Sequence, residues 1–300
     1  MIKLMKAGPY RYIDWGGPRN APLVHFAHGN GYPPGTYTPF IQELTTHYRV
    51  IGLEFFGSDF PIQPRLLKHW QQLAEQLKHF FEAGSFFPSI LLGHSSGATI
   101  TLYLATDYAA SSVVLLDPIV FSREFLAIWN IFKKIFRLKS ILLARSARKK
   151  KDTWSTYQEI EDYYHLKPLF KTWTEESFQS YLSAAIAKNN DDTYSLRYPK
   201  ELEARVYDTV PMYFWSEINQ VLAQSVIILR GSDSTTFTNR ALGQLTQQFP
   251  QAKTKCFQNL THYLPMEEPV NLGNYILTLL SNIQGNEGST ADTKQIRSPF

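Results

Sequence analysis

The chain has 300 residues, enough for one large domain or two smaller ones. Hydrophobic residues make up 44% of the sequence and charged residues 19%, a balance that excludes an intrinsically disordered chain. The net charge of 30 − 26 = +4 is too small to indicate a nucleic-acid partner. The single cysteine, Cys256, can form neither an intramolecular disulfide nor a cysteine-based zinc cluster.

No targeting segment is evident in the sequence. The N-terminus lacks the apolar stretch of a secretory signal, and no run of about eighteen apolar residues occurs. The expected location is therefore the cytoplasm.

Short apolar runs alternate with helical patterns over the first 118 residues. In chain order, a strand is expected at 23–27 and at 48–53, a helix at 66–81, a strand at 89–93, a helix at 97–108 and a strand at 113–116. Continuous apolar strands separated by helices are typical of βαβ units. The sequence therefore predicts an α/β protein with a mostly parallel central sheet flanked by helices.

This alternation of strands and helices is interrupted after the strand that ends near Leu116. Residues 119–223 show helical patterns and no convincing strand pair, so they are predicted to form a mainly helical cap. The alternation then resumes with a strand at 226–229, a helix at 239–248, a strand at 253–257 and a helix at 267–280. We expect a core of residues 1–118 and 224–283, followed by a mobile polar tail at 284–300.

Residues 93–97 read Gly-His-Ser-Ser-Gly, a Gly-x-Ser-x-Gly motif centred on Ser95. The motif follows an apolar strand and opens a helix near Ala98, which is the context it requires. Small flanking residues allow a strained turn that exposes the serine hydroxyl. Ser95 is the predicted nucleophile; the context disfavours the alternative of an ordinary helix-capping serine.

A serine nucleophile needs a base, and the expected chain order is serine, acid, histidine. Only His165 and His262 follow Ser95, and His165 lies within the insertion. His262 lies in the loop between the last strand and the last helix, so it is the predicted base. The predicted acid is Asp233, just after the strand at 226–229; the alternative is Asp117, which could also be a simple turn residue before Pro118.

The sequence His28-Gly29-Asn30-Gly31 follows the strand at 23–27. Two glycines allow a backbone amide to face a substrate. The predicted oxyanion hole consists of the backbone N–H groups of Asn30 and Ser96. His28 and His94 are interpreted as structural residues that hold these turns by hydrogen bonds.

Together these motifs resemble the α/β-hydrolase superfamily, over about residues 12–280. The motifs that carry the resemblance are His28-Gly-Asn-Gly31, Gly93-His-Ser-Ser-Gly97, Leu229-Arg-Gly-Ser-Asp233 and Thr261-His-Tyr-Leu-Pro265. Within the superfamily the chain looks like the cap-bearing serine hydrolases, which are esterase-like or lipase-like. The resemblance implies the same roles for Ser95, Asp233 and His262.

The insertion is rich in aromatic and basic residues. Its 19 aromatic residues in 105 favour an apolar roof over a pocket. An apolar stripe at helical spacing is interpreted as the packing face of the cap, and the alternative is an interfacial lid. The stripe consists of Phe125, Ile128, Trp129, Phe132, Ile135 and Phe136. Residues 131–151 contain nine Lys or Arg and no acid, which makes weak contact with an anionic membrane surface a hypothesis.

The predicted function is hydrolysis of a carboxylic ester with an apolar part through an acyl-enzyme, with no cofactor and no metal. Cleavage of a C–C bond, or acyl transfer, could use the same residues. A different class of function, non-catalytic ligand binding on this fold, is the other alternative. The fold alone does not decide among them.

Overall fold

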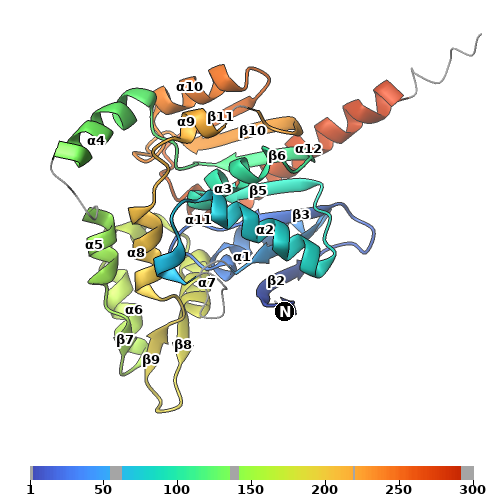
Figure 1. Ribbon diagram of the computed structural model, residues 1–300. Coiled ribbons are helices and arrows are strands. Elements are labelled where there is room, and N and C mark those ends of the chain that lie inside the picture. Colours follow the sequence, from blue (N-terminus) through green and yellow to red (C-terminus); the bar gives the residue numbers. More distant parts are fainter. Residues whose placement is uncertain (1–2, 55–62, 136–141, 219, 292–300) are drawn as a thin grey trace, which may run out of the picture.

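The computed structural model describes residues 3–54, 63–135, 142–218 and 220–291. An eight-stranded sheet with the order β1-β2-β4-β3-β5-β6-β10-β11 runs through its centre (Figure 1). The strands are β1 Lys3–Ala7, β2 Tyr10–Gly16, β3 Leu23–Ala27, β4 Arg49–Leu53, β5 Ile90–His94, β6 Ala110–Leu116, β10 Ala223–Gly231 and β11 Lys253–Phe257. β2 pairs antiparallel with β1 and β4, and all later neighbours pair parallel. The mostly parallel sheet predicted from the sequence is confirmed.

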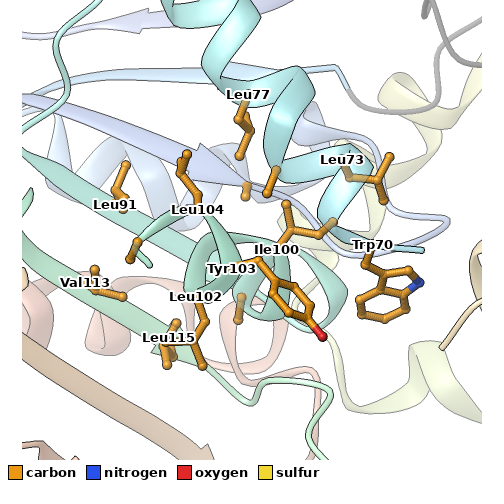
Figure 2. Close-up of a cluster of buried hydrophobic side chains, with 14 of the residues drawn as sticks. Trp70, Leu73, Leu77, Leu91, Ile100, Leu102, Tyr103, Leu104, Val113 and Leu115 are labelled. Carbon is orange, nitrogen blue, oxygen red and sulfur yellow. The ribbon is translucent and has the colours of Figure 1, made fainter. Parts of the chain in front are cut away.

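Side chains of the central strands alternate between two apolar cores. Leu91, Val113 and Leu115 lie on the face that is covered by α2 and α3 (Figure 2). Leu92 and Leu116 lie on the opposite face, with residues of α1 and α12. The flanking helices are α1 Thr38–Leu44, α2 Gln71–Gly84, α3 Ser96–Leu104, α10 Asn239–Gln248, α11 Leu264–Glu267 and α12 Pro269–Ala291, with short 3₁₀ turns at Pro34–Tyr37 and Pro64–Leu66. Each fully buried large apolar side chain contributes about 1.5–3 kcal/mol, so the two cores fix the register of the strands.

That register brings three strand ends together. His94 of β5 lies opposite Leu116 of β6, which lies opposite Leu229 of β10. The next residues are held at the same edge, because the N–H of Ser95 donates to the carbonyl of Leu116 and the N–H of Asp117 to that of Leu229. Polar side chains just beyond these ends are therefore neighbours in space.

The insertion lies at this carboxyl edge of the sheet (Figure 1). It contains α4 Arg123–Ile135, α5 Leu142–Arg148, α6 Tyr157–His165, a 3₁₀ turn at Pro168–Thr172, α7 Glu175–Ala185, α8 Lys200–Asp208 and α9 Phe214–Glu217. It also forms a small antiparallel sheet, β7-β9-β8, from Thr153–Trp154, Tyr194–Leu196 and Ile186–Lys188. The expectation of no strand pair was wrong, because strands of two or three residues are too short to show a period of two.

The last helix is longer than the sequence pattern predicts. It continues to Ala291, so residues 284–291 are helical rather than an irregular tail. Once a helix is nucleated, each added residue gains a backbone hydrogen bond without needing an apolar face. Residues 292–300 lie outside the described part of the chain. None of the described helices combines the length and apolar content needed to cross a bilayer.

We predict that Gly97→Ala strongly destabilises the fold, because a Cβ at this position would overlap the backbone carbonyl of Ala27. The expected loss is about 3 kcal/mol in the free energy of unfolding, measured by urea denaturation. The matched control is Gly243→Ala in α10, where a Cβ meets no atom within 4 Å. There the greater helix propensity of alanine should stabilise the protein by up to about 1 kcal/mol. Equal effects at the two positions would contradict this account of the turn.

Candidate active site

Ser95 occupies a strained turn between β5 and α3. Its backbone has φ 57° and ψ −126°, a conformation rare for a residue with a side chain. The flanking glycines make the turn possible: a Cβ on Gly93 would lie 2.6 Å from the carbonyl oxygen of Gly97. The turn places the Ser95 hydroxyl next to His262, at the wall of a cavity.

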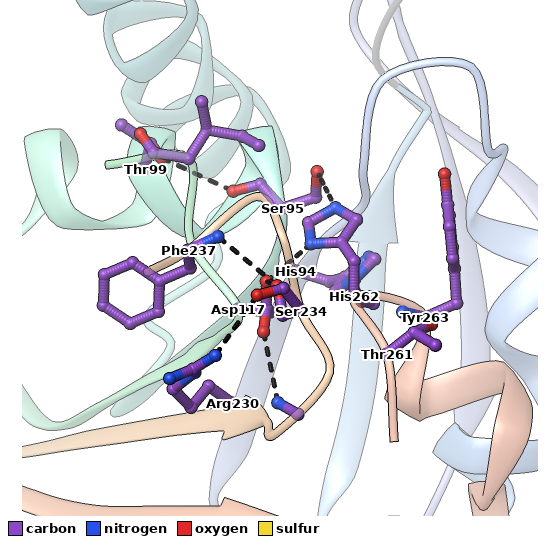
Figure 3. Close-up of polar contacts among 12 residues, drawn as sticks. His94, Ser95, Thr99, Asp117, Arg230, Ser234, Phe237, Thr261, His262 and Tyr263 are labelled. Atoms are coloured by element: carbon purple, nitrogen blue, oxygen red, sulfur yellow. Dashed lines mark hydrogen bonds and ion pairs between the residues drawn. The ribbon is translucent and has the colours of Figure 1, made fainter. Parts of the chain in front are cut away.

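His262 links Ser95 to a buried carboxylate (Figure 3). The Ser95 hydroxyl lies 2.9 Å from Nε2 of His262, and Nδ1 of His262 lies 2.6 Å from Oδ1 of Asp117. A carboxylate only accepts, so Nδ1 carries the proton and Nε2 is free to accept from the serine. The three side chains can therefore move a proton from the serine hydroxyl to the imidazole and stabilise the resulting imidazolium.

The Asp117 carboxylate is completely buried and fully engaged in hydrogen bonds. The hydroxyl of Ser234 donates to Oδ1 at 2.6 Å, and the N–H of Gly231 donates to Oδ2 at 3.2 Å. An ionised carboxylate out of contact with water is tolerated only when its oxygens are satisfied in this way. Sequence reasoning did not single out Ser234, whose only signal is its position just after the strand end.

The preferred assignment of the acid to Asp233 was wrong, and the alternative, Asp117, is the residue that contacts His262. Asp233 is exposed, and its carboxylate accepts from the Ser232 hydroxyl at 2.7 Å. The turn after β10 is anchored by Gly231 and directs Ser234, rather than Asp233, toward the sheet edge. The end of β6 places Asp117, with a left-handed φ of 43°, on the far side of His262 from Ser95.

A neutral histidine ties the surrounding loops together. The N–H of Gly29 donates to the Tyr37 hydroxyl, which donates to Nδ1 of His94 at 2.8 Å. Nε2 of His94 then donates to the carbonyl of His262 at 2.8 Å. Burial, helped by the nearby His262, holds the pKa of His94 well below its ordinary value. His94 therefore positions the turn before Asn30 and the loop of His262. Tyr37, which completes this hydrogen-bonded network, has no sequence signal that could have identified it.

The second structural histidine supports the same turn. His28 is buried, with Nδ1 2.9 Å from the carbonyl oxygen of Gly29 and Nε2 2.9 Å from the hydroxyl of Tyr198. It links the turn after β3 to the insertion.

The two predicted oxyanion donors lie beside Ser95. As the first residue of α3, Ser96 has a backbone N–H without an intrahelical acceptor. The N–H of Asn30, however, donates to the side-chain oxygen of Ser96 at 2.8 Å. The Asn30 amide is thus already hydrogen-bonded to the residue that follows the nucleophile.

A cavity of about 500 Å³ opens above Ser95 and His262. Its walls come mainly from the insertion and are mostly apolar or aromatic, including Trp70, Phe121, Leu126, Trp129, Val210 and Met212. Hydroxyl groups line it as well, from Tyr32, Tyr207 and Tyr263 near the catalytic end. In the described residues, no group of three or more His, Cys, Asp or Glu is arranged to hold a metal ion.

In the described part of α4, the predicted packing stripe is only partly covered. Phe125 and Ile128 are 48% and 69% exposed, whereas Leu126 is buried. The helix leaves the body of the protein at this point (Figure 1), so part of its apolar face meets solvent. Trp129 is half-buried and lines the cavity; Phe136 lies outside the described residues, and the side chains of Phe132 and Ile135 are not described.

The basic run at 131–151 is partly neutralised within the insertion. Arg148 pairs with Glu201 and Asp208, and Lys150 pairs with Glu203. Lys151 pairs with Glu159. These acids lie far along the chain or in other helices, so the local sequence overstates the charge available to a partner. Residues 136–141 of the run lie outside the described part.

A family comparison matches these features. The model of the alpha/beta hydrolase family matches residues 26–272. The chain belongs to this family. The match begins at the end of β3 and spans the Asn30 turn, the Ser95 motif, the insertion and the His262 loop. No curated protein sequence matches the chain.

Solved structures of hydrolases share the fold of this family member at low sequence identity. An E-2-(acetamidomethylene)succinate hydrolase superposes with a TM-score of 0.76 at 15% identity, covering 94% of this chain and 99% of the other. An esterase from Mycobacterium tuberculosis gives 0.70 at 15% identity, over 94% and 91%. The thioesterase domain from the curacin biosynthetic pathway gives 0.66 at 15% identity, over 93% and 99%. At these identities the likeness concerns the fold.

We predict that Asp117→Asn and Asp233→Asn have very different effects. An asparagine at 117 would favour the wrong tautomer of His262, so turnover of an activated ester should fall by about 10⁴-fold. Asp233→Asn changes an exposed side chain and should alter turnover by less than about threefold, equivalent to about 0.65 kcal/mol. Circular dichroism and thermal melting check that both variants are folded. A large loss in the Asp233 variant alone would contradict the assignment.

Proposed function

We propose that the protein is a serine hydrolase that cleaves a carboxylic ester with an apolar part. The observation that carries this proposal is the hydrogen-bonded chain Ser95–His262–Asp117 at the base of a largely apolar cavity. The strained turn at Ser95 and the buried carboxylate both cost stability, and a protein that only binds a ligand has no use for them.

In the first half of the reaction, Oγ of Ser95 attacks the ester carbonyl carbon while its proton passes to Nε2 of His262. The carbonyl electron pair moves to the oxygen, where hydrogen-bond donors of Asn30 and Ser96 stabilise the negative charge. The intermediate collapses, the carbon–oxygen bond to the alcohol breaks, and the alcohol leaves with the proton from His262. An acyl group remains on Ser95.

In the second half, a water molecule gives its proton to Nε2 of His262 and attacks the acyl carbon. Collapse of this second intermediate returns the proton to Ser95 and releases the carboxylic acid. The Asp117 carboxylate stabilises the imidazolium in both halves while it remains ionised. No step requires a cofactor.

The cavity walls favour a substrate with an apolar acyl or alcohol part. Aliphatic and aromatic side chains gain free energy by covering methylene groups, by about 0.8 kcal/mol for each group. The same nucleophile could serve C–C cleavage or acyl transfer. Ester hydrolysis is preferred over acyl transfer because water alone completes the cycle.

We predict that kcat/KM for p-nitrophenyl esters rises about fourfold with each methylene added after the acetate, until the cavity is filled. Ser95→Ala should abolish turnover at every chain length, because the remaining groups have no nucleophile. Initial rates over a series from acetate to dodecanoate measure both effects. If kcat/KM does not change with chain length but turnover is lost in Ser95→Ala, the apolar acyl site is disproved and the nucleophile is not. If turnover survives in Ser95→Ala, the assignment of Ser95 as the nucleophile is disproved.

We also propose that the first turn of α5 contacts an anionic lipid surface. Leu142 and Leu143 are 81% and 59% exposed and also line the cavity. Arg145 and Lys149 are exposed on the same segment. Apolar side chains beside cationic ones suit the boundary between headgroups and acyl chains.

Sedimentation with phosphatidylserine vesicles tests this contact. We predict salt-sensitive binding that Leu142→Ser weakens through lost apolar burial. Arg145→Gln should weaken it by about fivefold, since one cationic residue near the surface contributes about 1 kcal/mol. The control is Leu166→Ser, a leucine with 82% exposure at the end of α6 that does not line the cavity. Absence of binding by the unmodified protein at low salt would remove the proposal.

A further inference from the structure

The hydroxyl of Ser96 lies within hydrogen-bond distance of the Asn30 amide, one of the two predicted oxyanion donors. Ser96 is only 2% exposed, follows the nucleophile directly and lines the cavity. Its Oγ accepts a hydrogen bond from the N–H of Asn30 at 2.8 Å. The amide predicted as an oxyanion donor is therefore already engaged with this side chain.

An amide N–H carries one hydrogen, so Asn30 cannot give a full-strength hydrogen bond to Ser96 and to a substrate oxygen together. A hydroxyl, in contrast, accepts and donates at the same time. With its oxygen accepting from Asn30, the Ser96 hydroxyl retains one hydrogen, for which the described residues show no acceptor. Because the side chain lines the cavity, that hydrogen can be directed at a bound carbonyl oxygen.

We propose that Ser96 is a catalytic residue whose hydroxyl donates a hydrogen bond to the oxyanion, and that the Asn30 amide acts through it. This inference rests on the proposed ester hydrolysis. When Ser95 Oγ bonds to the carbonyl carbon, its proton goes to His262 and the carbonyl electron pair goes to oxygen. Ser96 keeps its own proton throughout and stabilises the charge only by donating the hydrogen bond.

Two features of the site support this role. The hydrogen bond from Asn30 polarises the Ser96 O–H, and a polarised donor interacts more strongly with an anion. The backbone N–H of Ser96 at the start of α3 provides a second donor from the same residue. The turn of Asn30 is in turn held by Glu203, whose carbonyl accepts from Nδ2 of Asn30 at 3.0 Å.

A purely blocking role for the Ser96 hydroxyl would change kcat in the opposite direction when the hydroxyl is removed. If the Ser96 hydroxyl merely blocked the Asn30 amide, its removal would free a donor and raise kcat. If the hydroxyl is itself the donor, its removal lowers kcat even though the Asn30 amide becomes free. The direction of the change in Ser96→Ala separates the two.

The experiment compares the unmodified protein with Ser96→Ala, Ser96→Gly and Ser96→Thr. The proposal predicts that kcat for a p-nitrophenyl ester falls by roughly 10- to 100-fold in the first two, below the full effect of a lost donor because Asn30 compensates in part. KM should change little, and Ser96→Thr should recover part of the rate. The control is Ser177→Ala, which removes another buried serine hydroxyl from the first turn of a helix, outside the cavity lining.

A second readout reports on the oxygen itself. In the acyl-enzyme, the carbonyl stretching frequency measured by infrared difference spectroscopy should rise in Ser96→Ala, because a weaker hydrogen bond polarises the carbonyl less. A kcat that is unchanged or higher in Ser96→Ala, with an unshifted carbonyl band, would overturn the inference. If the unmodified protein itself turns over no ester, the proposed function fails instead, so the two failures are distinguishable.

Discussion

Burial of the Asp117 carboxylate is the constraint on which the site depends. With no exposure to water, the group needs donors from the protein, and they come from separate segments: the turn after β10 and the loop before α11. Loss of the Gly231 N–H would leave Oδ2 without a partner, at a cost of about 1–3 kcal/mol, and loss of Ser234 or His262 would leave Oδ1 with one donor instead of two. The carboxylate therefore orients His262 and also fixes the two loops at the carboxyl edge of the sheet.

The strained backbone at Ser95 is maintained by its surroundings. Its N–H is bonded to Leu116, its motif glycines leave no room for side chains, and α3 continues directly into a core on one face of the sheet. The neutral His94 completes the frame by joining the Tyr37 hydroxyl to the carbonyl of His262. A rigid frame of this kind holds nucleophile, base and oxyanion donors in place before substrate binds, which is the source of electrostatic preorganisation.

The strands from β3 to β6, β10 and β11, the Ser95 turn and the choice of His262 were predictable because each has a local signal: an apolar run, a glycine-spaced motif or a position in the chain order. The two N-terminal strands β1 and β2 were not predicted. The acid was different. Asp117 and Asp233 both follow strand ends, and only the register of β6 with β10, together with the direction of the turn at Gly231, decides which one faces His262. The neutralisation of Arg148 and Lys150 by acids more than fifty residues away is likewise a tertiary effect with no local sequence signal.

A fluorophosphonate probe reports whether Ser95 is an activated nucleophile, because it reacts covalently with such serines. The site described here predicts one covalent adduct, located on Ser95 by mass spectrometry, and its loss in a folded His262→Ala variant. An adduct on another residue, or labelling of Ser95 that persists without His262, would contradict the account.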